Sequence, residues 1–177
     1  MANGYMGKIL NIDLTTGSIE TEALEESICQ DYIGGYGLGA RLLYDRIPKG
    51  ADPLGPDNIL GLLTGPLTGT PAIIGSRFVA VGKSPKTAGG WGDANCGGFF
   101  GPHLKFAGFD GVLFKGIADK PVYLMIDEGQ AELLDASDLW GQGVTSLEDL
   151  LKERHGKNIQ ICSIGPAGDK LSFRQVS

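Results

Sequence analysis

The feature that most constrains the fold is the density of glycine between Gly65 and Gly116, above all in the segment from Gly75 to Gly111. Glycine accounts for 29 of 177 residues, about 16% against roughly 7% in average proteins, and the absence of a G-X-Y period excludes collagen. Because glycine lacks a Cβ, its backbone N–H can face a ligand directly. The excess therefore predicts turns and a close approach of backbone to ligand.

Within that segment, a β-branched and aromatic run at Arg77–Val81 leads into a glycine-dense turn region, then two Gly-Gly pairs around Asn95, then a helix start. A strand, a glycine turn and a helix N-terminus together favour anions, since free N–H groups and the helix dipole both attract negative charge. Arg77 is the best-placed cation. Lys83 and Lys86 are interpreted as solvated turn residues. The segment predicts a phosphate cradle.

Composition narrows the class of protein further. The length of 177 residues fits one domain. The formal net charge of −6 argues against a nucleic-acid partner, which needs a broad basic face. Cys29, Cys96 and Cys162 lie far apart without a CxxC, so neither a disulfide framework nor a thiolate metal site is indicated. No apolar run approaches the ~18 residues of a membrane span. We expect a cytoplasmic protein.

Short apolar runs bounded by turn residues predict an α+β fold of mostly antiparallel β-sheets, two of them stacked, with short helices. Expected strands lie in a hairpin at 5–22 and at 59–65, 77–81, 110–116, 122–127, 131–137 and 159–164. Expected helices lie at 22–33, 34–46, 102–107 and 146–154, the last with Ser146 or Thr145 as N-cap.

Two glycine patterns raise further hypotheses, a dinucleotide-binding fingerprint and an internal repeat. Gly35, Gly37 and Ala40 form G-x-G-x-x-A, but an acidic helix precedes them where a dinucleotide fingerprint needs a strand. Close packing of a helix start is the better interpretation. The segments beginning at Gly34 and Gly97 both run Gly-Gly-aromatic into a helix and then an apolar strand, so an internal pseudo-repeat is a second hypothesis.

Several motifs occur in an order found in one family: NIDLTTGSIE, IGGYGLGARLLYDRI, GPLTGTPAIIGSRF, NCGGFFGPHLKFAGFDG, DASDLWG and SIGPAG. Together they resemble the N-terminal domain of the aldehyde ferredoxin oxidoreductase family. The resemblance implies a floor beneath a bis-pyranopterin cofactor that holds tungsten or molybdenum. It also implies that Arg77, Asn95 and Gly97 contact the pterin phosphates, with Asn95 helping to hold a magnesium ion between them.

The physical chemistry of these three residues suits that role. Arg77 offers a rigid fork of donors to phosphate oxygens, Asn95 a neutral oxygen suited to Mg²⁺, and Gly97 an unobstructed N–H. Simpler interpretations are a surface ion pair for Arg77, a left-handed turn for Asn95 and backbone geometry alone for Gly97. Packed or structural roles are expected for Cys96, Trp91, His103 and His155.

The resemblance also implies what lies outside this chain. We expect residues 1–177 to form a single cofactor-binding N-terminal domain, a piece of a longer polypeptide or a stand-alone relative, without the iron–sulfur and catalytic domains. Many family members have Arg where this chain has Tyr36. The parent enzyme would oxidise aldehydes and pass electrons through a [4Fe-4S] cluster to ferredoxin. The isolated chain would be inactive, and a homo-oligomer is left open.

Two alternatives to this function stay open. One is a relative that acts on aromatic acyl thioesters. The other is a non-catalytic module that binds a pterin, another phosphate-bearing ligand or only a partner subunit.

Overall fold

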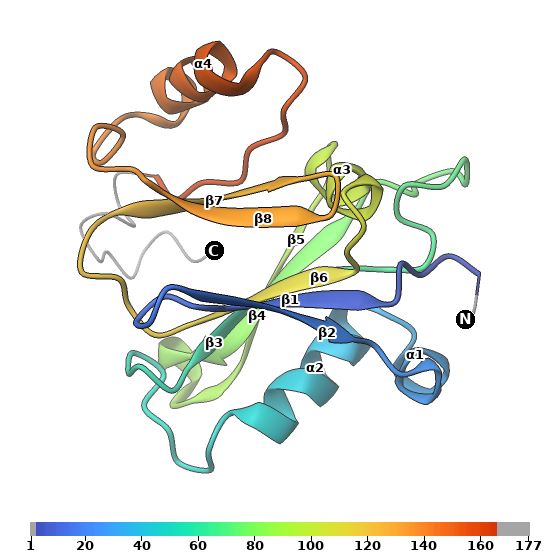
Figure 1. Cartoon of the computed structure of the whole chain (residues 1–177). Coiled ribbons are helices and arrows are strands. Elements are labelled where there is room, and N and C mark those ends of the chain that lie inside the picture. Colours follow the sequence, from blue (N-terminus) through green and yellow to red (C-terminus); the bar gives the residue numbers. More distant parts are fainter. Residues whose placement is uncertain (1–2, 166–177) are drawn as a thin grey trace.

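The computed structural model describes residues 3–165, which form one six-stranded sheet, a separate two-stranded sheet and four α-helices (Figure 1). The strands are β1 (Lys8–Asp13), β2 (Ser18–Ala23), β3 (Ile59–Thr64), β4 (Phe78–Ser84), β5 (Gly90–Cys96), β6 (Gly111–Lys115), β7 (Val122–Asp127) and β8 (Gln130–Asp135). The helices are α1 (Glu26–Tyr32), α2 (Gly35–Arg46), α3 (Phe100–Phe106) and α4 (Val144–His155), with a short 3₁₀ turn at Pro85–Thr87.

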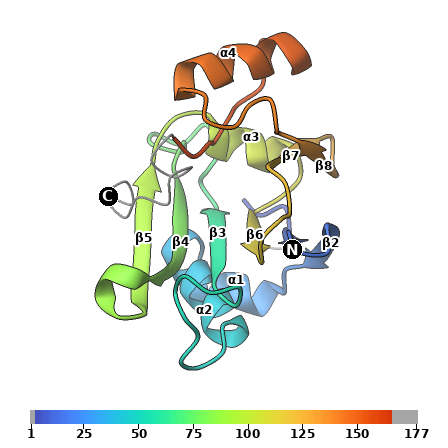
Figure 2. The same ribbon diagram turned by 90° about the vertical axis from the view of Figure 1, so that its left-hand side faces the viewer.

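The large sheet has the strand order β2-β1-β6-β3-β4-β5. Every neighbouring pair is antiparallel except β1 with β6. Figure 2 shows β5 at one edge, followed across the sheet by β4, β3 and β6. The α+β prediction with mostly antiparallel strands and two sheets is therefore confirmed. Both Gly-Gly-aromatic segments lead into a helix and then a strand, α2 into β3 and α3 into β6.

Both faces of the large sheet are covered (Figure 1). Helices α1 and α2 lie on one face, where Leu38 and Leu42 pack with Leu63 and Val81. On the other face, Leu104 of α3 and the β7–β8 hairpin pack against the other side of β1 and β6. Helix α4 closes a smaller cluster against the hairpin. Strand β3 is a continuous apolar run, ILGLLT, and every residue of it except Leu60 is buried.

Three expectations about elements were wrong. Residues 90–96 were expected to be a turn region but form strand β5, so Asn95 lies in a strand and not in a left-handed turn. Residues 159–164 are not a strand in the described part of the chain, although Ile159 and Ile161 pack on the third cluster. Helix α4 is preceded by Gly143 with no side-chain cap, not by Ser146 or Thr145.

A buried ion pair ties distant segments together beneath the sheet's end. Lys105 Nζ lies 2.7 Å from Asp110 Oδ1, and the side chains are 5% and 2% exposed. Lys105 also donates to the Gly4 carbonyl, and the Asp110 carboxylate accepts from the N–H groups of Met6 and Gly7. The pair therefore joins the N-terminal segment, α3 and the start of β6.

Within the described residues, no helix is long and apolar enough to cross a membrane. The motif SIGPAG, at residues 163–168, extends beyond the part of the chain that the structure describes, as does everything after it.

Candidate functional site

The candidate site lies beside the α1–α2 junction, where β3 and β5 end and β4 begins. The β4–β5 register pairs Val79 with Asn95, which brings Asn95 level with the start of β4. Arg77, directly before β4, donates a hydrogen bond from Nη1 to Asn95 Oδ1. These two residues, 18 apart in sequence and both predicted to contact the cofactor, are thus side by side; the contact itself stays a prediction. Both side chains are exposed.

A hollow of about 220 Å³ opens at this point. Its walls come from the α1–α2 junction, the end of β3 with the loop after it, the start of β4 and the end of β5. The lining residues are Ile33, Gly34, Gly35, Tyr36, Leu63, Gly65, Pro66, Thr68, Arg77, Phe78, Val79 and Asn95. The segment from Gly75 to Gly111 contributes Arg77 and Asn95 to this hollow but none of its glycines, and the glycines that line it are Gly34, Gly35 and Gly65.

The α1–α2 junction makes the wall that faces the loop after β3. Ile33 has φ 62° and ψ −69°, and Gly34 N donates to Tyr32 O over 2.7 Å, which is a strained γ-turn at a β-branched residue. A Cβ on Gly34 would lie 2.8 Å from Gly65 Cα, so only glycine allows this approach. The turn aims the start of α2 at the hollow.

Helix α2 starts at this wall without a side-chain cap. The first N–H groups of a helix have no partner inside it, and the dipole makes that end partly positive. Gly34, Gly35 and Tyr36 all line the hollow. The open end of a 12-residue helix therefore adds to the positive potential of Arg77. The glycines of G-x-G-x-x-A serve packing: a Cβ on Gly37 would meet the Tyr32 carbonyl oxygen.

The side chain of Tyr5 hydrogen-bonds to the backbone of the γ-turn at Ile33. Its hydroxyl is shared between the carbonyl oxygens of Cys29 and Ile33. Burial raises the pKa of the Tyr5 phenol, with smaller contributions from Cys29 and the Asp110 carboxylate. The phenol therefore stays protonated and can donate. Sequence analysis gave Tyr5 no role, and its place in an expected strand gave no signal of one.

Gly97 follows β5 and is not part of the hollow's lining. A Cβ at this position would meet nothing within 4 Å, so packing of the described chain does not demand glycine there. That leaves an open approach to its backbone, which a ligand contact would use. The contact itself remains a prediction.

Several other residues considered in the sequence analysis do not line this hollow. Lys83 Nζ donates to the Ala51 carbonyl and is not a free cation. Trp91 is 39% exposed and donates to Asp93, so the expectation of core packing was wrong. Cys96 is exposed on the edge strand and is not a packed side chain. His155 Nε2 bonds the Tyr123 hydroxyl at 2.9 Å, in keeping with a structural role.

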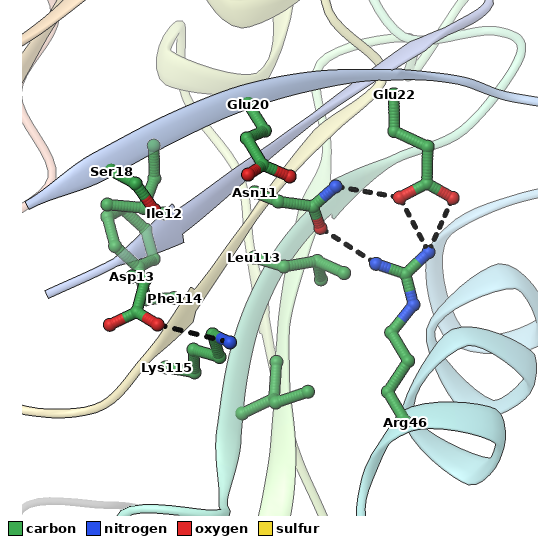
Figure 3. Close-up of a pocket in the computed structure, with 11 residues that line it drawn as sticks. Asn11, Ile12, Asp13, Ser18, Glu20, Glu22, Arg46, Leu113, Phe114 and Lys115 are labelled. Carbon is green, nitrogen blue, oxygen red and sulfur yellow. Dashed lines mark hydrogen bonds and ion pairs between the residues drawn. The ribbon is translucent and has the colours of Figure 1, made fainter. Parts of the chain in front are cut away.

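A larger hollow of about 340 Å³ lies elsewhere, between the β1–β2 hairpin, β6 and the end of α2 (Figure 3). Both of its cations are paired with carboxylates. Arg46 bonds both Glu22 and Asn11, and Lys115 lies 3.1 Å from Asp13 (Figure 3). Because both cations are already paired, this hollow suits an anion less well than the smaller one, which is lined by Arg77, three glycines and the start of α2.

The side chains that line the smaller hollow are suited to binding a ligand. Its lining holds one guanidinium, one amide and two hydroxyls, and it has no His, Cys, Asp or Glu. Without a general base or a nucleophile activated by one, these side chains cannot carry out acid–base or covalent catalysis. Residues 3–165 also contain no group of three His, Cys, Asp or Glu residues arranged to hold a metal ion. The guanidinium of Arg77 and the open end of α2 suit an anion.

The rim of the hollow is apolar and uncovered. Ile33 and Tyr36 line it and are exposed. The loop between β3 and β4, which contributes Pro66 and Thr68 to the lining, also exposes Leu67, Ile73 and Ile74, the last two by 91% and 86%. Exposed large apolar side chains are typical of a surface that another part of a protein covers.

Comparison with known proteins gives consistent results. The family described as "Aldehyde ferredoxin oxidoreductase, N-terminal domain" matches residues 9–175. The tungsten-containing aldehyde ferredoxin oxidoreductase of Pyrococcus abyssi is 46% identical over 175 residues, which are 98% of this chain and 29% of that protein. The WOR-like subunit of the aliphatic sulfonate oxidoreductase of Pyrococcus furiosus is 39% identical over 155 residues, 85% of this chain and 24% of that protein.

Among solved structures, the active site complex BamBC of benzoyl coenzyme A reductase, in complex with 1,5-dienoyl-CoA, superposes with a TM-score of 0.91. The sequence identity is 37%, and the match covers 95% of this chain and 26% of that one. In each comparison this chain spans less than a third of the relative's length.

Proposed function

Since this chain belongs to the aldehyde ferredoxin oxidoreductase family, as its N-terminal domain, we propose that it is the cofactor-seating part of a cytoplasmic tungsten-containing oxidoreductase. Its hollow would receive the phosphate end of a tungstopterin. The observation that carries the proposal is the hydrogen-bonded pair of Arg77 and Asn95, from separate strands, at the mouth of a glycine-lined hollow without acid–base groups.

The residues present fit such a group. Arg77 uses one Nη1 hydrogen on Asn95, and its planar fork keeps further donors for two phosphate oxygens. The Asn95 amide oxygen has a second lone pair, which suits a magnesium ion that takes its other ligands from phosphate and water. Gly97 would offer its N–H on the uncrowded side of β5. The exposed end of α2 adds a partial positive charge on the opposite wall.

In the parent enzyme, an aldehyde and water would give a carboxylic acid, two protons and two electrons, and the electrons would pass through a [4Fe-4S] cluster to ferredoxin. The tungsten and its dithiolenes supply that redox chemistry when bound. This chain's own residues bind and orient the phosphates and contribute no proton transfer. The remaining domains would cover the apolar rim, in keeping with a chain under a third of its relatives' length.

A second reaction has a specific observation in its favour. The structural match at a TM-score of 0.91 is to an active site complex of benzoyl coenzyme A reductase. An aromatic acyl thioester is therefore the alternative substrate class, with the same seating role for Arg77 and Asn95. A non-catalytic phosphate-binding module is the third reading.

The deciding experiment uses the full-length parent, produced in cells supplied with tungstate. Purified protein is analysed for tungsten and iron, then assayed with a series of aldehydes and ferredoxin, and separately with benzoyl coenzyme A and a low-potential donor. Tungsten with aldehyde oxidation supports the main proposal, and tungsten with thioester reduction supports the alternative. Protein that is folded, free of tungsten and molybdenum, and inactive in both assays would leave only the module.

A further inference from the structure

The β3–β4 ladder is interrupted at the mouth of the hollow. Its last registered pair is Thr64 with Phe78. Thr64 N donates to Asp110 O, toward β6, and successive residues of an antiparallel strand point their N–H groups to opposite sides. The N–H of Gly65 therefore points toward β4, opposite the carbonyl of Arg77. A direct bond between these two groups would continue the ladder by one step.

The hydroxyl of Thr68 takes the place of that bond. Thr68 Oγ1 accepts from Gly65 N over 3.1 Å and donates to Arg77 O over 2.8 Å. One side-chain oxygen is thus inserted between two backbone groups that would otherwise meet. The ends of β3 and β4 are held apart by the width of a hydroxyl at the point where the hollow opens.

The inserted hydroxyl is fixed in place. Thr68 is only 5% exposed. Behind it, α3 packs so closely that a Cβ on Gly101 would lie 3.1 Å from Thr68 Cγ2 and 3.3 Å from Arg77 O. The close packing of the methyl group therefore limits the rotamer, and the two hydrogen bonds of the hydroxyl are partly buried. Removing the hydroxyl would take this partner from both backbone groups.

We propose that Thr68 is a positioning residue for phosphate binding: its hydroxyl keeps the strand ends apart and so sets Arg77 over the hollow, facing Asn95. Thr68 lines the hollow, but its hydroxyl is bonded to Gly65 N and Arg77 O, so we assign its effect on binding to the placement of Arg77. This role rests on the proposed function, in which Arg77 binds the cofactor's phosphates. Loss of the hydroxyl would leave the Gly65 N–H and the Arg77 carbonyl without this partner, and the start of β4 would shift as they form other hydrogen bonds.

The test compares three variants of the full-length parent loaded with tungsten. Thr68→Val keeps the shape and removes the hydroxyl, and Thr68→Ser keeps the hydroxyl and removes the methyl. Thr70→Val is the matched control, because the Thr70 hydroxyl also bridges a carbonyl and an N–H, those of Leu67 and Ala72, but within the loop alone. Tungsten retained per protein is followed during dialysis, beside the thermal transition of each cofactor-free variant.

We expect Thr68→Val to release tungsten about tenfold faster than wild type, the effect of roughly one unmade buried hydrogen bond. Thr68→Ser should stay within about twofold, and Thr70→Val should match wild type. In an Arg77→Ala background, Thr68→Val should increase tungsten release little further, because its effect on tungsten depends on the Arg77 guanidinium. Its effect on the thermal transition of the cofactor-free protein should persist, because that effect does not depend on the guanidinium.

Equal release rates for wild type and Thr68→Val would overturn the inference, as would an undiminished effect of Thr68→Val in the Arg77→Ala background. Loss of tungsten from Thr70→Val to the same extent would also overturn it, by showing that any change in the loop suffices. Wild-type protein that holds no tungsten would instead refute the proposed function itself.

Discussion

Replacing Lys105 by methionine tests how much the buried Lys105–Asp110 ion pair contributes to the stability of the fold. Lys105 and Asp110 form an ion pair whose side chains are 5% and 2% exposed. In Lys105→Met the carboxylate keeps only the N–H groups of Met6 and Gly7, and the Gly4 carbonyl loses its donor. Breaking a buried pair by removing one partner costs about 3–5 kcal/mol, because a charge is left uncompensated.

The assay is urea unfolding of the 177-residue chain, followed by circular dichroism. With an m-value of about 2 kcal/mol/M, the expected loss lowers the midpoint by about 2 M. The control is Arg41→Met, since the Arg41–Asp45 pair is 40% and 41% exposed and an exposed pair is worth at most about 1 kcal/mol.

A double variant separates the charge from the lost packing. Lys105→Met with Asp110→Asn removes the stranded charge, and the Asn oxygen can still accept from Gly7 N–H. The double variant should therefore be more stable than Lys105→Met alone. A midpoint for Lys105→Met no lower than that of Arg41→Met, or a double variant as unstable as the two single changes summed, would refute the reasoning.

Three further results are expected. Ile33→Gly should raise stability by about 1 kcal/mol in the same urea assay, because Ile33 is 64% exposed and its φ of 62° strains a β-branched residue; a loss would mean that the turn is unstrained. Tyr5→Phe should lower stability by about 0.5–1.5 kcal/mol, by removing the hydroxyl shared by Cys29 and Ile33, while Tyr44→Phe at a side chain 84% exposed should not. The Lys115 ammonium and the amides of Thr16 and Thr15 hold the pKa of Asp13 below its ordinary value of 3.8. Its stabilising contribution is therefore complete above that value and lost as pH falls through the lowered pKa, so Asp13→Asn should flatten this part of the acid unfolding curve.

Strands and helices with strong apolar patterns were predictable. Strand β7 lies at Val122–Asp127, as its apolar run predicted, and Pro102 lies in the first turn of α3. Strand β5 was not predictable, because Gly90, Gly92, Asp93 and Asn95 have low strand propensity. Pairing with β4 along seven residues overrides that local preference. Residues 159–164 show the reverse, since a strong apolar run forms no strand without a paired neighbour in the described chain.

The ligand class and the candidate residues of the site were predictable from the sequence, but the contacts that bring them together were not. The glycine density and Arg77 pointed to an anion, and the family resemblance added Asn95 and Gly97. The meeting of Arg77 with Asn95 depends on the β4–β5 register, which no local pattern encodes. Thr68 and Tyr5 act through backbone groups distant in sequence, and Lys105 with Asp110 read as ordinary surface charges until burial is known.

We propose that the hollow beside Arg77 and Asn95 holds a phosphate-bearing metal cofactor. This proposal is tested by the tungsten content of the full-length parent with Arg77→Ala, measured beside wild type and Arg41→Ala. We expect Arg77→Ala to lose most of its tungsten and Arg41→Ala to retain it, with both cofactor-free variants unfolding at nearly the wild-type temperature. Full tungsten content in Arg77→Ala, or a loss matched by reduced stability of the cofactor-free protein, would contradict it.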